Sequence, residues 1–175
     1  SPYLGRVTVL INDGAGRFTQ TKSFATGGSP LAIAIEDFNG DGNADIVAKG
    51  ASGGLSLFAG DGAGNFTERA SGLATEFASA RFTTGDFDGD GAADLAVVSA
   101  SEQECSMRVK KLLILYGNAN GGFGRMRMIG TMILPGVMFA GDLNGDGRSE
   151  LVFSGACSSG RGLYVMLGAK DGLGS

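Results

Sequence analysis

Three nine-residue segments of this sequence carry oxygen-bearing side chains at the same positions: residues 37–45, 86–94 and 142–150. Each segment has Asp, Asn or Glu at positions 1, 3, 5 and 9, and glycine at positions 4 and 6. Ca²⁺ takes carboxylate, amide and backbone carbonyl oxygens as ligands, and a tight glycine turn lets alternate residues supply them. The types and spacing of these residues therefore predict three loops that each bind a calcium ion.

The predicted ligands are the residues at positions 1, 3, 5, 7 and 9 of each loop, with a backbone carbonyl as the donor at position 7. In sequence order they are Asp37, Asn39, Asp41, Asn43, Asp45, Asp86, Asp88, Asp90, Ala92, Asp94, Asp142, Asn144, Asp146, Arg148 and Glu150. The second loop has four carboxylates, and each of the others has three. Because ligand charge tunes calcium affinity, we predict that the second loop binds most tightly.

Turn formation alone is the other explanation for these segments, because Asp and Asn cap turns and glycine adopts positive φ. It does not explain why carboxylates occupy positions 1, 5 and 9 in all three loops, since neighbouring acids repel one another without a cation. Ten of the 18 acidic residues lie in these loops. Three divalent ions would add six charges and change the formal net charge from −4 to +2.

Other metal-binding patterns do not fit the sequence. An EF-hand loop needs a bidentate Glu at position 12, where these loops have Ala48, Val97 and Phe153. Zinc sites use His and Cys, and the chain has no His and two Cys. Mg²⁺ prefers fewer protein ligands and more water. Calcium, at about three ions per chain, is therefore the cofactor that the loops predict.

A second glycine-rich motif alternates with the loops. Residues 12–18 and 60–66 share the pattern Asp-Gly-Ala-Gly-x-Phe, and residues 117–123 and 168–173 are weaker copies. The motif's Phe recurs at 18, 66 and 123, and the loops begin at 37, 86 and 142. Both series repeat about every 50 residues, a period typical of solenoids and propellers. We expect five phenylalanines to pack in the core or between repeats: Phe18, Phe38, Phe66, Phe87 and Phe123.

Short runs of β-branched, aromatic and aliphatic residues lie between the motifs and are bounded by Gly, Asp or Asn, as strands are. Examples are residues 7–11, 31–35, 46–48, 55–58, 95–98, 112–116, 151–153 and 163–167. Each repeat then has four strands: one before the loop, one after it, one before the glycine-rich turn and one that begins at its Phe. Four antiparallel strands in about 50 residues predict a propeller blade, so the fold class is all-β.

The chain holds about thirteen such strands, a little over three blades, whereas closed propellers have about four to eight blades. We interpret residues 1–175 as one partial propeller domain, with a half blade at 1–28, blades at 29–77 and 78–131, and an incomplete blade at 132–175. Such a chain is either part of a longer propeller or closes a ring with a second copy. Two copies would hold about 26 strands, near the 28 of a seven-bladed ring.

These residues resemble the FG-GAP repeats, also called VCBS repeats, of integrin α-subunit propellers and of many secreted bacterial proteins. The matching signature is Asp-Phe-Asn-Gly-Asp-Gly-x-x-Asp-Ile/Leu-Val, followed by a Gly-Asp-Gly-x-Gly-x-Phe turn, and it covers nearly the whole chain. The resemblance implies a seven-bladed, usually extracellular β-propeller, with calcium in the loop between the first two strands of a blade. The chain departs from the pattern in its low blade count, in Glu150 at position 9 and in its degenerate last turn.

The two cysteines fall in comparable places. Cys105 and Cys157 lie in the turns between the second and third strands of consecutive repeats. Equivalent turns of neighbouring blades lie side by side, so a disulfide between them is one possibility, and it would fit secretion. Two free thiols are the other.

Composition and motifs exclude several classes of function. Without His, the chain has no Ser-His-Asp or Cys-His arrangement, and it has no GxSxG or phosphate-loop motif, so we predict that it is not an enzyme. The net charge of −4 argues against a nucleic-acid partner. No apolar run reaches the roughly 18 residues of a membrane helix, so we predict no membrane insertion.

The sequence thus predicts a calcium-stabilised propeller segment of a secreted or cell-surface protein, which mediates adhesion or protein–protein interaction. A carbohydrate-binding propeller is one alternative, although the absence of Trp leaves only Tyr3, Tyr116 and Tyr164 to stack on a sugar. An accessory domain of a larger secreted enzyme is another. The sequence does not identify the protein or glycan ligand.

Overall fold

A computed structural model of the chain describes residues 5–26, 28–51, 54–73, 81–98, 110–131, 135–157 and 160–169. In this part of the chain, thirteen β-strands form four antiparallel sheets. The same residues contain no helix long and apolar enough to cross a membrane.

The strands are short and follow the predicted runs. They are β1 (Arg6–Asn12), β2 (Phe18–Ala25), β3 (Pro30–Glu36), β4 (Asp45–Gly50), β5 (Leu55–Gly60), β6 (Phe66–Leu73), β7 (Arg81–Gly85), β8 (Asp94–Val98), β9 (Lys110–Asn118), β10 (Gly122–Thr131), β11 (Pro135–Gly141), β12 (Glu150–Cys157) and β13 (Gly160–Met166). Consecutive strands pair within each sheet, in the orders β1-β2, β3-β4-β5-β6, β7-β8-β9-β10 and β11-β12-β13. The prediction of an all-β fold built from antiparallel blades is confirmed, with two, four, four and three strands.

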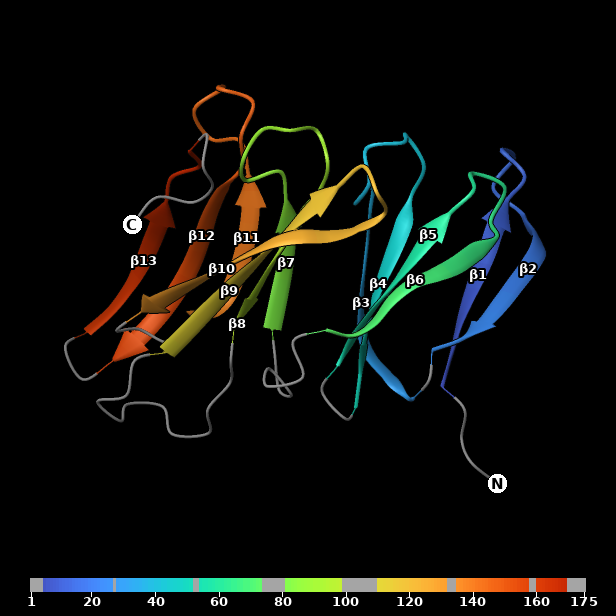
Figure 1. Cartoon of the computed structure of the whole chain (residues 1–175), viewed down its shortest axis with the longest axis horizontal. Helices are drawn as coiled ribbons and strands as arrows, with labels where there is room; N and C mark the ends of the chain where they lie inside the picture. The colour runs from blue at the N-terminus through green and yellow to red at the C-terminus, as the bar shows by residue number, and fades with distance from the viewer. Residues whose placement is uncertain are drawn as a thin grey trace.

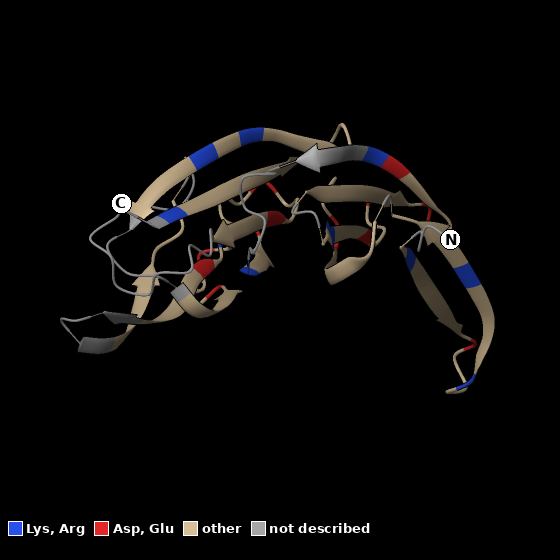
Figure 2. Ribbon diagram, turned by 90° about the horizontal axis from the view of Figure 1, so that it is seen from below, with Lys and Arg blue, Asp and Glu red and all other residues tan. Residues whose placement is uncertain are grey.

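We refer to the four sheets, in chain order, as blades 1 to 4. The blades stand side by side in one row, with blade 1 and blade 4 at its two ends (Figure 1). Seen from below, the row bends into an open arc and not a closed ring, as expected of a partial propeller (Figure 2). The predicted blade boundaries stay predictions, because residues 27, 74–80 and 132–134 lie outside the described part.

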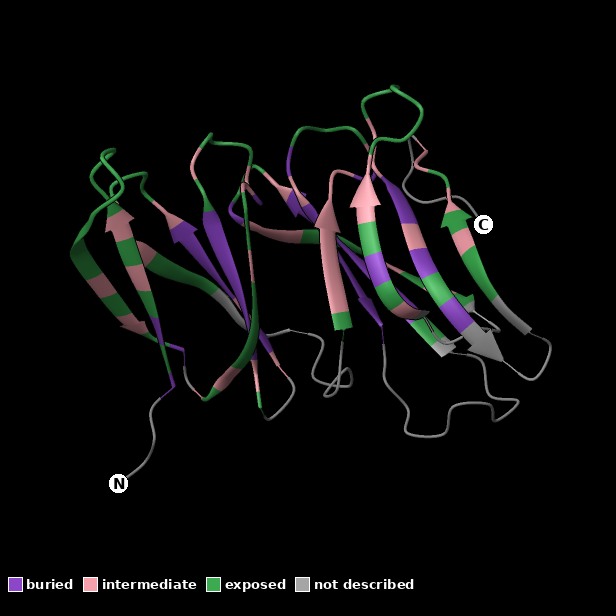
Figure 3. Ribbon diagram, turned by 180° about the vertical axis from the view of Figure 1, so that it is seen from behind, coloured by how far each residue is buried: buried purple, intermediate pink, exposed green. Residues whose placement is uncertain are grey.

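Apolar side chains fill the spaces between neighbouring blades. One buried cluster joins blade 1 to blade 2 around Val7, Ile46 and Phe58, a second joins blades 2 and 3, and a third joins blades 3 and 4. The second strands β4 and β8 are covered on both faces, and nearly all of their residues are buried (Figure 3). Strands covered on both faces carry continuous apolar runs and no alternation, which explains the runs in the sequence.

The phenylalanine at the start of each fourth strand packs against the preceding blade. The ring of Phe66 lies 5.2 Å from that of Phe24 in blade 1, and the ring of Phe123 lies 5.7 Å from that of Phe38 in blade 2. Phe18 belongs to blade 1, before which the described residues form no blade, and it is 60% exposed. The expectation of a packed position is therefore wrong for Phe18, because no sheet among the described residues covers its ring.

Gly117 lies where blade 3 touches blade 2 and leaves no space for a side chain. A Cβ at this position would lie 2.4 Å from the carbonyl oxygen of Ala93 and 2.6 Å from that of Phe38. Both neighbours are backbone atoms that cannot turn away, so Gly117→Ala should lower the free energy of unfolding by about 2 kcal/mol or more. Urea unfolding followed by circular dichroism measures this loss.

Gly122→Ala is the matched control for this change. A Cβ on Gly122 meets nothing within 4 Å, so the free energy of unfolding should change by about 0.5 kcal/mol or less. Equal losses in the two variants would contradict the close contact between the blades.

Candidate metal-binding loops

Residues 37–45, 86–94 and 142–150 connect the first and second strands of blades 2, 3 and 4, which is where the resemblance places calcium. All three loops lie on the same edge of the row, at the top of Figure 1. The glycines at positions 4 and 6 have φ values of 71° to 89°, in the left-handed region that other residues rarely adopt. This conformation turns backbone N–H groups toward the side chain at position 1.

The carboxylate at position 1 holds each loop in shape. Asp86 Oδ1 accepts a hydrogen bond from the backbone N–H of Gly89 at 2.6 Å, and its Oδ2 accepts one from Gly91 at 3.0 Å. Asp37 and Asp142 accept the same bonds in the first and third loops. The residue predicted as the first metal ligand is therefore also the residue that forms the turn.

The carboxylate at position 9 connects each loop to the third strand of its blade. Asp94 is fully buried, and its two oxygens accept hydrogen bonds from the backbone N–H groups of Phe87, at 2.8 Å, and Gly117, at 3.0 Å. The other loops repeat this pattern, with distances of 3.1 Å from Phe38 and 2.9 Å from Gly60 to Asp45, and 2.8 Å from Leu143 and 3.4 Å from Gly168 to Glu150. The longer side chain of Glu150 thus makes the same connection as an Asp.

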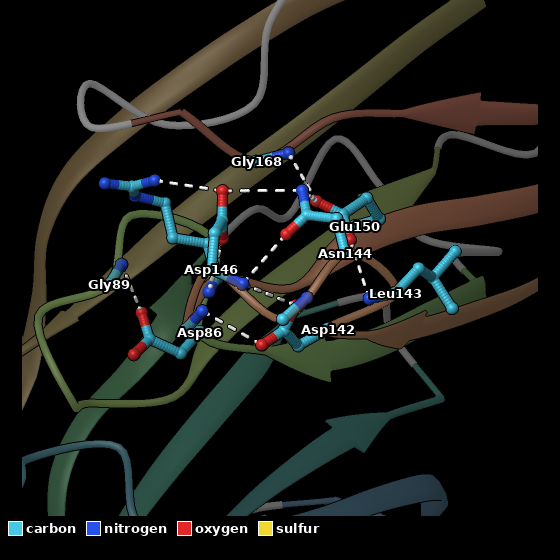
Figure 4. Close-up of polar contacts among 11 residues, drawn as sticks. Asp86, Gly89, Asp142, Leu143, Asn144, Asp146, Glu150 and Gly168 are labelled. Carbon is cyan, nitrogen blue, oxygen red and sulfur yellow. Dashed lines mark hydrogen bonds and ion pairs between the residues drawn. The ribbon is translucent and has the colours of Figure 1, made fainter.

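A backbone hydrogen bond links each loop to the preceding one. The N–H of Ala93, at position 8 of the second loop, donates at 2.8 Å to the carbonyl oxygen of Asp37, at position 1 of the first. The N–H of Ser149 donates in the same way to the carbonyl oxygen of Asp86, at 2.6 Å. Figure 4 shows the third loop beside Asp86 and Gly89 of the second. The three loops therefore form one connected edge.

Three carboxylates converge in the second loop. Asp86, Asp88 and Asp94 each offer an oxygen, and these oxygens lie within 4.8 Å of one another. Asp88 Oδ1 is buried and has no hydrogen-bond partner among the described residues. Burial raises the pKa of Asp88 and raises the pKa of Asp94 to about 7, and neighbouring carboxylates add to both shifts. A cation would relieve this desolvation and repulsion, so the group of oxygens fits a hard divalent metal ion.

Positions 3 and 5 make local hydrogen bonds. At position 3, the amide of Asn39 donates to Asp41 Oδ2 at 3.0 Å, and that of Asn144 donates to Asp146 Oδ2 at 3.4 Å. The position 5 carboxylates, including that of Asp90, each accept from the backbone N–H two residues further along. Over the described ranges, the second loop holds the one converging group of three acidic side chains, and Asp90 is not part of it.

The side chains at position 7 lie against neighbouring turns. A Cβ on Gly62 would lie 2.5 Å from Oδ1 of Asn43, and a Cβ on Gly89 would lie 3.1 Å from Cγ of Arg148. Ala92 is buried. The contribution of their backbone carbonyls to a metal ion stays a prediction, as do the complete ligand sets of the first and third loops.

Arg125 belongs to the site and was not found from the sequence. Its Nη2 lies 2.7 Å from Asp88 Oδ2, and its guanidinium carbon lies 3.8 Å from the centre of the Tyr116 ring. The sequence places Arg125 on an outer strand, 37 residues from Asp88, and no pattern shows that the side chain reaches the loop. The one feature of the sequence that pointed to a basic partner was the extra carboxylate at position 3 of the second loop, because a buried carboxylate needs a counter-ion.

Some residues of the predicted sugar-stacking tyrosines and of the predicted disulfide lie outside the described residues. Tyr116 is buried and Tyr164 stacks on another ring of blade 4, so both rings are engaged within the propeller. Tyr3 and Cys105 lie outside the described residues. The disulfide between Cys105 and Cys157 therefore stays a prediction.

Asp94→Ala tests the connection between the second loop and the third strand. The change leaves the buried N–H groups of Phe87 and Gly117 without an acceptor, so the free energy of unfolding should fall by about 2–4 kcal/mol. Asp90→Ala, which removes an exposed turn cap, is the control and should cost about 1 kcal/mol or less. Urea unfolding in chelator measures both variants without any metal contribution. A smaller loss for Asp94→Ala than for Asp90→Ala would refute the structural role of position 9.

Comparison with known families identifies the repeats. A sequence model described as an FG-GAP-like repeat matches residues 1–48 and residues 37–97, which together span more than half of the 175 residues. Comparison with curated proteins gave no match. The third loop lies beyond the matched residues but makes the same hydrogen bonds as the first two. Such repeats fit a propeller-like adhesion or protein-interaction module. The chain belongs to the family of FG-GAP-like repeat proteins.

Proposed function

We propose that this chain is a calcium-stabilised β-propeller segment of a secreted or cell-surface protein, where it mediates adhesion or protein–protein interaction. Membership of the FG-GAP-like repeat family supports an interaction role. The observation that carries the proposal of a metal site is the convergence of Asp86, Asp88 and Asp94, with a buried oxygen of Asp88 that has no partner among the described residues. Donors that are all oxygen favour calcium over zinc.

The ions would stabilise the fold and not take part in a reaction. In the second loop, Asp86 holds the turn and Asp94 connects it to the third strand, and a cation between them would neutralise charges that burial makes costly. A site filled at about a hundred times its dissociation constant adds about 2.7 kcal/mol to stability. This is large against the roughly 5–15 kcal/mol that separates folded from unfolded protein.

Secretion and the absence of catalysis belong to the same proposal. The loops lack the bidentate Glu of an EF-hand and lie at an exposed edge, which suits the weak calcium sites, with dissociation constants of about 10⁻⁴–10⁻³ M, of extracellular modules. The chain has no His, and the position 1 carboxylates are engaged by backbone N–H groups. These features support a scaffold over an enzyme.

Calcium should raise the melting temperature of the protein. In saturating calcium chloride we expect a midpoint about 5–10 °C above that in chelator, because bound ions stabilise only the folded state. Calorimetric titration should give about three ions per chain. Magnesium chloride, and sodium chloride at matched ionic strength, are the controls and should shift the midpoint less. Identical melts in calcium and in chelator would overturn the proposal.

We further infer that a second copy of the chain covers the open face of blade 4. Leu163 and Val165 of β13 are 72% and 50% exposed. Gly168 of blade 4 corresponds to Gly117 of blade 3, because each donates to the position 9 carboxylate of its blade. By this alignment, Leu163 and Val165 correspond to Leu112 and Ile114 of β9, which are fully buried between blades 3 and 4. Blade 4 therefore presents a face of the kind that another blade of this repeat covers.

A second uncovered apolar surface lies on β3 of blade 2, near the blade 1 end of the row. Leu31, Ile33 and Ile35 of β3 are largely exposed, beside blade 1, in which the structure describes only β1 and β2. Two copies that pair through their ends would bury both apolar surfaces, which supports the expectation that a second copy completes the ring.

Size-exclusion chromatography with light scattering tests the pairing. We expect a mass of about twice the 17.7 kDa of the chain. Val165→Lys places a charge in the apolar contact and should give a monomer, whereas Met128→Lys, at an exposed site on β10, should leave the mass unchanged. A monomeric wild-type protein, in calcium and in chelator, would refute self-association.

A further inference from the structure

Arg125 brings a positive charge from the outer strand of blade 3 to the second loop. Its Nη2 lies 2.7 Å from Asp88 Oδ2, and the Asp88 side chain is only 14% exposed. The guanidinium lies over the Tyr116 ring, 3.8 Å from its centre, which fixes the position of the charge. The Arg125 side chain itself is 47% exposed. Because its carboxylate partner is shielded and its guanidinium is stacked, the pair is still held more firmly than a contact between two mobile surface side chains.

Blade 2 has different residues at the corresponding positions. In blade 3, Tyr116 comes directly before Gly117, which donates to position 9, and Arg125 of β10 pairs with Tyr116. In blade 2, Ala59 comes directly before the corresponding Gly60, and Thr67 of β6 pairs with Ala59. Position 3 of the loop changes from Asp in blade 3 to Asn in blade 2. The arginine, the aromatic ring beneath it and the extra carboxylate therefore occur together in blade 3.

The hydrogen bonds give a physical reason for this association. In the first loop, the Asn39 amide donates to the Asp41 carboxylate at 3.0 Å, and the Asn of the third loop donates in the same way. The side chain of Asp88 has no N–H to donate, and it adds a negative charge to the loop. Arg125 supplies both the donor and the opposite charge.

We propose that Arg125 is the internal counter-ion of the second loop and limits its calcium affinity by sharing Asp88 with the ion. This inference rests on the calcium function proposed above. A cation bound to Asp88 would lie near the guanidinium, and repulsion between the like charges would weaken its binding. The prediction that the second loop has the highest calcium affinity counts only its four carboxylates. The positive charge of Arg125 offsets the fourth carboxylate, that of Asp88.

Tyr116 makes the second loop measurable by itself in the full chain. Tb³⁺ is a hard cation that takes oxygen ligands, as Ca²⁺ does, and it emits light when a nearby tyrosine absorbs. Tyr116 lies beneath the arginine that contacts Asp88, so its ring should sensitise an ion in this loop. Tyr116→Phe keeps the ring and should remove that emission, which identifies the signal. Displacement of terbium by calcium then gives the dissociation constant of the second loop.

Arg125→Met keeps an apolar stem over the ring and removes the charge. We expect calcium to bind the second loop about tenfold more tightly in this variant. Arg125→Lys keeps the charge and should stay within about threefold of wild type. In the Asp88→Asn background, Arg125→Met should change the affinity by about twofold or less, because the pair that it removes is already absent.

The outcomes separate this inference from the calcium function itself. Unchanged or weaker binding by Arg125→Met, in a wild type that binds calcium, overturns the inference alone. The inference is also overturned if Arg125→Met raises the calcium affinity equally in the wild-type and Asp88→Asn backgrounds, because Arg125 would then act only as a distant charge. No calcium binding by wild type or by Arg125→Met, measured by calorimetry, overturns the proposed function and this inference together.

Melting in chelator gives a second readout that needs no bound metal. Arg125→Met should melt below wild type, because it leaves Asp88 buried without its counter-ion. The same change in the Asp88→Asn background should lower the melting temperature less. Equal decreases in the two backgrounds would refute the pairing of Arg125 with Asp88.

Discussion

The buried carboxylate at position 9 is the interaction on which the rest of each blade depends. In blade 3, Asp94 accepts N–H groups from the loop, at Phe87, and from the end of the third strand, at Gly117, so one side chain fixes two connections of the sheet. A buried charge is costly unless it is fully paired. Burial raises the pKa of Asp94 to about 7, although the hydrogen bonds from Phe87 and Gly117 act in the opposite direction. Hydrogen bonds therefore hold the loop, and its three converging carboxylates still lack a positive charge between them, which favours a bound cation.

The same region controls how the blades pack together. Gly117, which donates to Asp94, also approaches the backbone of Phe38 and Ala93 so closely that a Cβ would clash. Loop geometry and blade packing are thus linked through one residue. Because each blade buries its apolar faces against its neighbours, stability belongs to the row of blades and not to a single sheet. This explains why one side of β3, with Leu31, Ile33 and Ile35, and one side of β13, with Leu163 and Val165, are exposed: no other sheet of the described part covers them.

Much of the fold could be predicted from the sequence, because two motifs mark the two hairpins on one edge of each four-stranded blade. Their alternation gives the number and order of the strands, and the carboxylates at positions 1, 3 and 9 of the second loop meet as the spacing suggested. The exposure of Phe18 could not be predicted, because it depends on whether a blade precedes its own. The reach of Arg125 depends on the bulge between Phe123 and Arg125, which decides the residue that faces Tyr116. Sequence periodicity does not record such a change of register.

The backbone hydrogen bonds from Ala93 to Asp37 and from Ser149 to Asp86 have a consequence for the geometry of the whole edge. Their donors and acceptors are main-chain atoms, so the step from one loop to the next does not depend on which side chains the loops carry. Substitutions can change the charge and the affinity of a single loop while the spacing between loops stays the same. The main chain therefore sets the spacing of the loops along this edge, and each added repeat would extend the edge by one such step.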